Sequence, residues 1–284
     1  MAASPQDPSS RATVIAVAPN GGRRTKWDHP ALPMTAADLA DTAAACLAAG
    51  AAMIHVHVRD REGRHLLDAA AYAEALAAMR AAVGSRLVLQ ITSESLDIYP
   101  PAAQMEVVKA VRPEAVSLAL REFAPDAAAE AGFTDFLAWL RRERVVPQII
   151  LYAPEEAVRL DDMRRRGLIP FADLPVLYVL GRYTAGQTSR PAELLPFLAP
   201  DMPRFRHWMT CAFGRHEAAC VTAAALLGGH ARVGFENNLL LPDGSQAPSN
   251  AALVEAVATA LRACGLRPAR GEELREAWST LAFG

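Results

Sequence analysis

The sequence predicts an α/β protein of the (β/α)8, or TIM, barrel class. Short segments rich in valine, isoleucine and leucine alternate with longer segments rich in alanine and leucine. This alternation repeats eight times along the 284 residues, and no linker-like stretch interrupts it. Repeats of this kind with short connections are typical of a parallel sheet covered by helices. Eight of them at this length favour a closed barrel over an open, doubly wound sheet.

The first four β-α units fill the amino-terminal half of the chain. Their predicted strands, apolar and often β-branched, are Thr13–Ala18, Ala52–Arg59, Arg86–Thr92 and Ala115–Leu120. Their predicted helices are Thr35–Ala49, Asp68–Ala82, Pro101–Val111 and Thr134–Glu143. Threonine and aspartate are common helix caps, proline suits a first helical turn, and Gly50 ends the first helix.

The last four units continue the pattern without a break. Their predicted strands are Val146–Tyr152, Val176–Leu180, Phe205–Ala212 and His230–Phe235. Their predicted helices are Pro154–Arg166, Pro191–Leu198, His216–Leu227 and Asn250–Cys264. Two of these helices begin with proline, and a glycine pair follows the seventh helix as a stop signal.

The composition indicates a globular protein with a large apolar core. Hydrophobic residues make up 52% of the chain and the net charge is -2, which argues against a nucleic-acid partner. No apolar stretch is long enough to span a bilayer, so we expect no membrane partner. The four cysteines lack CxxC spacing and are typical of reduced thiols in a cytoplasmic protein. Residues 1–11 predict a disordered tail without a signal peptide, and residues 12–284 predict a single catalytic domain.

The second predicted strand carries two histidines on one face. Alternate side chains of a strand point to opposite faces, so His55 and His57 share a face that excludes Ile54, Val56 and Val58. Two imidazoles near the end of a strand suit a divalent metal ion. The alternative is a pair of hydrogen-bonded core histidines.

The last predicted strand supplies a third ligand. Arg232 and Glu236 share the polar parity of this strand, and Glu236 follows its carboxyl end. In a closed barrel the eighth strand lies two places from the second, so His55, His57 and Glu236 can converge on one ion. Two imidazoles and a carboxylate with an open position form the ligand set of a catalytic zinc. The alternative for the glutamate is a salt bridge to Arg232 or Arg59.

Other polar residues follow the strand ends. The loop from Asn20 to Thr25 contains Arg23 and Arg24 and can bind an anion, or it is a solvated loop. The Ser93 hydroxyl can bind a carboxylate or cap the next helix. Arginines near several strand ends predict an anionic substrate.

The remaining histidines have no assigned chemistry. We expect core or structural roles for His207 and His230, and surface positions for His29, His65 and His216.

The chain resembles the β-keto acid cleavage enzymes from about residue 13 to about residue 265. Five segments resemble motifs of this family. They are Ala18–Gly21 (APNG), His55–Asp60 (HVHVRD), Ser117-Leu118, Gly228–Asn238 (GGHARVGFENN) and Ser249–Ala251 (SNA). The resemblance implies a zinc-dependent (β/α)8 barrel that converts a β-keto acid and acetyl-CoA to acetoacetate and a new CoA ester. It also implies a homo-oligomer, a dimer or tetramer.

The resemblance assigns roles to single residues. His55, His57 and Glu236 would bind zinc, Arg232 would belong to the catalytic polar group, and Ser93 would contact the substrate carboxylate.

Some positions depart from the family pattern. Asn237 stands where the family has an aspartate that assists proton removal, and an amide cannot act as a base. Either Glu94 or Glu122 substitutes for it, or Asn237 orients a water. We predict catalytic roles for Arg232, Asn237 and Glu94. We predict substrate contacts for Asn20, Arg23, Ser93 and Glu122.

Three further departures concern the substrate. Arg23 lies where the amino-substrate enzyme has an acidic residue, and Gln148 and Ile150 stand where members often have glutamate. We therefore expect a neutral or acidic β-keto acid rather than an amino-bearing one.

Two other functions fit parts of the pattern. An amidohydrolase-type metal barrel also contains a His-x-His pair, but it needs histidines on strands five and six, and none is present there. A non-catalytic barrel that holds a metal and a keto acid is the other alternative, which acetyl-CoA-dependent product formation would exclude.

Overall fold

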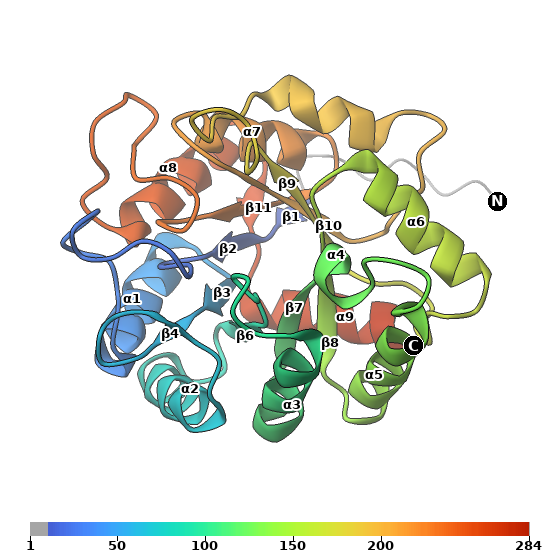
Figure 1. Cartoon of the computed structure of the whole chain (residues 1–284). Helices are drawn as coiled ribbons and strands as arrows, with labels where there is room; N and C mark the ends of the chain where they lie inside the picture. Colours follow the sequence, from blue (N-terminus) through green and yellow to red (C-terminus); the bar gives the residue numbers. More distant parts are fainter. Residues whose placement is uncertain (1–10, 284) are drawn as a thin grey trace.

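The computed structural model describes residues 11–283 and contains a closed barrel of eight parallel strands (Figure 1), as the sequence predicts. Around the barrel the strands are β2 (Ile15–Val17), β3 (Met53–Val56), β6 (Val88–Thr92), β7 (Ala115–Ala119), β8 (Val146–Leu151), β9 (Val176–Leu180), β10 (Trp208–Ala212) and β11 (His230–Val233). The last strand, β11, pairs with β2 and closes the barrel. Of the predicted tail, residues 1–10 lie outside the described part of the chain.

Helices surround the barrel in the predicted order. They are α1 (Ala36–Ala49), α2 (Ala69–Val83), α3 (Pro101–Val111), α5 (Glu130–Arg142), α6 (Pro154–Arg165), α7 (Glu217–Leu226) and α8 (Asn250–Ala263). Thr35 and Asp38 form a capping box at the start of α1, and Asp68 accepts a hydrogen bond from the amide of Ala71. The sixth segment, η2 (Pro191–Leu198), is a 3-10 helix, and Pro196 inside it has no amide proton for an α-helical bond.

The ends of several predicted strands lie outside the barrel. The second one leaves the barrel after Val56, because the Asn20 side chain bonds both backbone groups of His57. Beyond it, β4 (Val58–Arg59) forms an antiparallel hairpin with β5 (His65–Leu66). The last strand ends at Val233, where Gly234 turns the chain with a φ of 135°. A short helix, α4 (Leu120–Phe123), follows β7 directly.

The carboxyl-terminal segment was not predicted. A short strand, β12 (Arg267–Pro268), pairs with β1 (Ala12–Thr13), and α9 (Gly271–Phe283) then crosses the amino-terminal end of the barrel. Trp278 of α9 packs among the inward-facing side chains and donates a hydrogen bond from its indole to Nδ1 of His207 over 3.1 Å. This helix covers the amino-terminal end of the barrel, so the opposite end is the one left for a site.

The core has two layers. Side chains such as Ile54, Val56 and Val58 face the helices, whereas Met53 and Met209 fill the barrel interior. The predicted parity of the second strand is therefore correct. Among residues 11–283, no helix combines the length and apolar character needed to cross a membrane.

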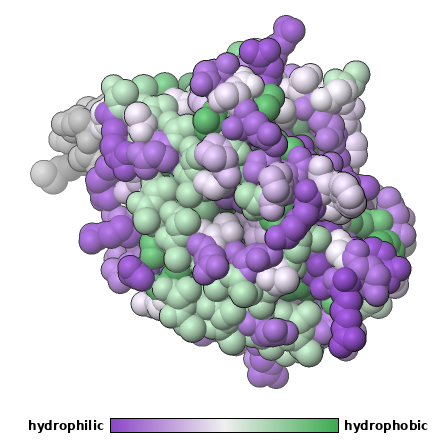
Figure 2. Space-filling model, turned by 90° about the vertical axis from the view of Figure 1, so that its left-hand side faces the viewer, coloured by the Kyte–Doolittle hydropathy of each residue, from purple (hydrophilic) through white to green (hydrophobic). Residues whose placement is uncertain are grey.

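One face of the molecule is rich in hydrophobic residues. Figure 2 shows them gathered on the side where α1 and α2 lie in Figure 1. Both helices contribute exposed alanines to it, including Ala44, Ala48, Ala73 and Ala77.

We predict that Gly234→Ala lowers the free energy of unfolding by about 2–5 kcal/mol, because it adds backbone strain and a steric clash. A Cβ at Gly234 would collide with the carbonyl oxygen of Ala18. The control is Gly244→Ala, which also has a positive φ but no atom within 4 Å of the added carbon. It should lose only about 1–2 kcal/mol in urea unfolding. Equal losses in the two variants would contradict the steric explanation.

Candidate metal centre

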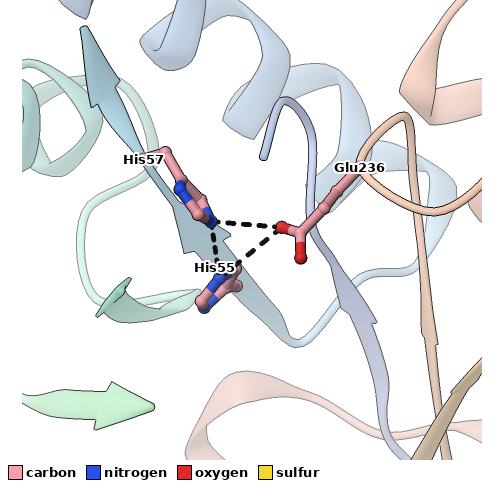
Figure 3. Close-up of side chains that lie close together, drawn as sticks. All are labelled: His55, His57 and Glu236. Carbon is pink, nitrogen blue, oxygen red and sulfur yellow. Dashed lines mark hydrogen bonds and ion pairs between the residues drawn. The ribbon is translucent and has the colours of Figure 1, made fainter. Parts of the chain in front are cut away.

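Two histidines and a glutamate meet at the carboxyl end of the barrel (Figure 3). His55 lies on β3, His57 follows that strand, and Glu236 lies in the turn after β11. The Nε2 atoms of the histidines are 3.2 Å apart, and Oε2 of Glu236 is 3.6 Å from His55 Nε2 and 3.3 Å from His57 Nε2. Both imidazoles are buried. The structure thus brings together the three residues that the sequence predicts as metal ligands.

A chain of amides orients the ring of His55. Its Nδ1 lies 2.8 Å from Oε1 of Gln90, and Nε2 of Gln90 donates to Oε1 of Gln148 over 3.1 Å. Because the Gln90 oxygen accepts, Nδ1 of His55 carries the proton and its Nε2 presents a lone pair to Glu236. A partner of this kind on the far nitrogen is typical of metal-binding histidines.

The three atoms facing one another fit a cation. Oε2 of Glu236 is buried and has no hydrogen-bond partner. A single imidazole proton can form a hydrogen bond between only two of the three atoms, which are the two histidine Nε2 atoms and Oε2 of Glu236. A divalent ion can bind all three at once. The residues present therefore fit a metal ion with two nitrogen ligands and one oxygen ligand.

Burial and charge set the protonation state of this cluster. Burial, together with the nearby Arg232 guanidinium, lowers the pKa of His55 to about 3, so its ring is neutral as a metal ligand must be. Burial alone would raise the pKa of Glu236, but Arg232 and the two histidines hold it well below its usual range. Arg232 pairs with Oε1 of Glu236, which leaves Oε2 for the histidines. The salt bridge considered as an alternative thus coexists with the ligand arrangement.

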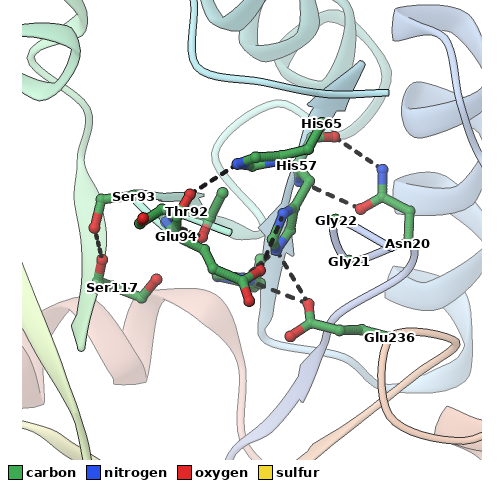
Figure 4. A network of polar contacts seen from close by, with 12 residues as sticks. Asn20, Gly21, Gly22, His57, His65, Thr92, Ser93, Glu94, Ser117 and Glu236 are labelled. Carbon is green, nitrogen blue, oxygen red and sulfur yellow. Dashed lines mark hydrogen bonds and ion pairs between the residues drawn. The ribbon is translucent and has the colours of Figure 1, made fainter. Parts of the chain in front are cut away.

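The first loop holds the backbone at His57 in place (Figure 4). The Asn20 amide donates to the carbonyls of His57 and Pro33, over 2.8 and 3.1 Å, and its oxygen accepts from the amide of His57. Arg59 donates to the carbonyl of Gly22 over 2.8 Å rather than to Glu236. These contacts make Asn20 a positioning residue for His57. Asn20 also lines the outer cavity described below, so its predicted contact with the substrate stays a prediction.

Glu94 and His65 complete the wall beside His57. Oε2 of Glu94 is 3.9 Å from Nδ1 of His57, and Nε2 of His65 lies 2.8 Å from the carbonyl oxygen of Glu94. The predicted surface position of His65 is wrong, because the β4–β5 hairpin folds it against His57, with ring centroids 5.4 Å apart. His29 is also buried, with Nε2 at 2.9 Å from the Ala247 carbonyl oxygen.

A cavity opens directly onto the three candidate ligands. Its remaining lining residues are Thr92, Glu94, Ser117, Ala119, Ile150, Tyr152, Leu177, Val179, Arg182, Cys211, Phe213 and Arg232. An outer cavity adjoins it and contains Asn20, Arg23, Arg24 and Gln187. The two cavities share Glu94, Arg182, Phe213 and Glu236.

Ser117, rather than the predicted Ser93, presents its hydroxyl to the cavity. The Ser93 hydroxyl donates to the carbonyl of Ser117 over 2.6 Å and does not line the cavity. The hydroxyl of Ser117 does line it, is buried and has no partner. Parity within β7 could have indicated this, because Ser117 shares the inward face with Ala115.

Two other predicted site residues also lie outside both cavities. Glu122 accepts from the amide of Ser95 over 3.1 Å and from the side chain of Gln104 over 2.6 Å, which gives it a structural role. The amide group of Asn237 is fully buried without a hydrogen-bond partner. The predicted catalytic residues Arg232 and Glu94 and the predicted substrate contacts Asn20 and Arg23 do line the cavities.

Comparisons with known proteins agree with one another. A family model for the beta-keto acid cleavage enzyme matches residues 12–279. The chain is 28% identical to the 3-keto-5-aminohexanoate cleavage enzyme of Fusobacterium nucleatum, over 93% of this chain and 96% of that protein. It is also 28% identical to the 3-oxoadipate:acetyl-CoA acetyltransferase of Cupriavidus necator, over 86% and 87% of the two chains.

Solved structures support the barrel. The ternary complex of ObcA with C4-CoA adduct and oxalate has a TM-score of 0.67 and 16% identity, and the match covers 88% of this chain and 68% of that one. A likeness at this identity shows the fold alone.

We predict that Gln90→Leu weakens the binding of a divalent metal ion by about 10–100-fold, because Nδ1 of His55 loses its acceptor. Competition with a chromophoric chelator would measure the affinity. The matched variant Gln90→Glu keeps an acceptor oxygen at the same place and should stay within about threefold of the parent. Equal losses in both variants would show that Gln90 does not act through the His55 tautomer.

Proposed function

The chain belongs to the beta-keto acid cleavage enzyme family, and from this premise we propose that it is a zinc-dependent transferase acting on a β-keto acid and acetyl-CoA. The keto acid exchanges its acyl group for acetyl: R–CO–CH2–COO⁻ and CH3–CO–SCoA give R–CO–SCoA and acetoacetate. The bond between the keto carbon and its methylene breaks, and the methylene forms a new bond to the acetyl carbon. The CoA thiolate leaves the acetyl group and joins the original acyl group.

The observation that carries this proposal is the cluster of His55, His57 and Glu236 facing a cavity. Two nitrogens and one oxygen suit zinc, although cobalt and iron accept the same ligand set. A bound zinc ion would act as a Lewis acid and polarise the keto oxygen.

Other residues that line the cavity would bind the carboxylate of the substrate and transfer the proton. The buried guanidinium of Arg232 and the unpartnered hydroxyl of Ser117 face the cavity and would bind the carboxylate of the keto acid. Glu94 would take a proton from the methylene group and return it to acetoacetate, since its carboxylate lines both cavities. Asn237 is buried outside the cavities and carries no basic group. Burial raises the pKa of Cys211 to about 12, so this thiol would stay protonated and would not act as a nucleophile.

The outer cavity suits the CoA ester. Arg23, Arg24 and Arg182 line it, and their positive charges would attract the phosphate groups of CoA. The acyl end would then reach the inner cavity through the residues that the two cavities share.

The proposal includes three further properties: the charge of the substrate, the oligomeric state and the cellular location. The surplus of arginine at the outer cavity favours a neutral or acidic β-keto acid over an amino-bearing one. The exposed alanines of α1 and α2 would allow close packing between copies in a dimer or tetramer. Buried, unpaired Cys46 and Cys220 suit a cytoplasmic location.

We predict that Glu94→Gln lowers kcat by about 10²–10⁴-fold while zinc content and thermal stability stay unchanged, because only the general base is lost. Glu122→Gln is the control for the other carboxylate candidate and should retain most of kcat.

His55→Ala should abolish both zinc binding and activity and leave the circular dichroism spectrum intact. Full activity of a zinc-free His55→Ala enzyme would refute the proposed function.

We predict faster turnover of 3-oxoadipate than of 3-keto-5-aminohexanoate, because arginines surround the entrance. Mass detection of the new CoA thioester, with acetyl-CoA as co-substrate, measures both reactions under the same conditions. Equal or faster turnover of the amino compound would contradict this expectation.

A further inference from the structure

The cavity above the candidate metal centre has two chemically different halves. Strands β11, β3, β6 and β7 and the turns after them supply its polar groups, which are Arg232, Glu236, His55, His57, Thr92, Glu94 and Ser117. Strands β8, β9 and β10 with their ends supply Ile150, Tyr152, Leu177, Val179, Cys211 and Phe213. Beyond the end of β9, Arg182 lines the cavity at its mouth. Apart from this guanidinium and the phenol of Tyr152, the second half contains only hydrocarbon and thiol groups.

The apolar half is continuous across neighbouring strands. Ile150 pairs in register with Ala119 on one side and with Leu177 on the other. One level nearer the mouth, Val179 pairs with Cys211, and Cys211 pairs with Arg232. The apolar wall therefore begins directly beside the guanidinium that we assign to the keto acid carboxylate.

The residues that β8, β9 and β10 themselves contribute to the cavity, Ile150, Leu177, Val179 and Cys211, offer no partner for a charged group. Along β9 and its end, the first charged side chain is Arg182, which lies where the inner and outer cavities meet. Its guanidinium carbon lies 5.3 Å from the ring centre of Phe213. A carboxylate or ammonium placed among Ile150, Leu177 and Val179 would lose its hydration without gaining an ion pair, which is strongly unfavourable.

We propose that this apolar half binds the substituent of the keto acid, and that the substrates are β-keto acids with an uncharged hydrocarbon substituent. The inference rests on the proposed function, because the polar half must hold the keto and carboxylate oxygens for the substituent to face β8–β10. It narrows the expected substrates from neutral or acidic β-keto acids to neutral ones. It also separates this chain from the two relatives above, whose names contain an amino-bearing and a dicarboxylic keto acid.

Three keto acids of equal chain length test the proposal on the zinc-loaded enzyme with acetyl-CoA. They are 3-oxohexanoate, 3-oxoadipate, in which a carboxylate replaces the terminal methyl, and 3-keto-5-aminohexanoate. We expect kcat/KM for 3-oxohexanoate to exceed that for either charged compound by at least about 100-fold. A kcat/KM for 3-oxoadipate equal to or above that for 3-oxohexanoate would overturn the inference and leave the proposed function standing. No turnover of any compound would overturn both.

A substitution in the wall provides an independent readout. Val179→Asp places a carboxylate in the apolar half and should lower kcat/KM for 3-oxohexanoate by at least about 10-fold, mainly through KM. It should also shift the preference among the three compounds toward the amino-bearing one. The matched control is Val158→Asp, the same change at an exposed position on α6. It should alter neither kcat/KM for 3-oxohexanoate nor the preference among the three compounds.

If Val179→Asp fails to fold, Val179→Thr introduces only a hydroxyl, and its KM for 3-oxohexanoate should still rise severalfold. An unchanged KM and an unchanged preference in a folded Val179 variant would contradict the proposal.

Discussion

The closure of the barrel between β11 and β2 is the constraint on which the candidate site depends. His55 and His57 come from β3 and its end, whereas Glu236 comes from a turn about 180 residues later. Only the order β11-β2-β3 in a closed barrel places that turn beside the histidines. The amide of Glu236 donates to the carbonyl of Ala18 over 3.1 Å, which fixes the turn to the end of β2. The ligand geometry is therefore a consequence of strand order.

Charge compensation lets this cluster exist in a buried position. An isolated carboxylate would be unstable there, and Arg232 pairs with one oxygen of Glu236 and stabilises its charge. His55 remains a neutral donor because burial and the same guanidinium lower its pKa to about 3. The guanidinium of Arg232 thus stabilises the charge of Glu236 and, together with burial, the neutral ring of His55. This combination is also what a divalent metal ion requires.

The predicted side-chain positions that differ from the structure have a common physical cause. Ser93, Glu122 and His65 were assigned from their position after a strand or within a loop, where the local sequence does not fix the direction of a side chain. Their contacts are with distant parts of the chain: the Ser117 carbonyl, Gln104, and the ring of His57. Ser117, in contrast, lies inside a strand, where alternation does fix the direction, and it faces the cavity.

Sequence periodicity alone predicts the eight β-α repeats, the inward faces of the second and last strands, and the candidate ligands His55, His57 and Glu236, because these features follow from periods of two and 3.6 residues. The strand ends, the position of α9 across the amino-terminal end of the barrel and the polar walls of the cavity become visible only in the folded chain. Those features depend on which strands become neighbours and on hydrogen bonds such as those of Asn20, which join residues far apart in the chain.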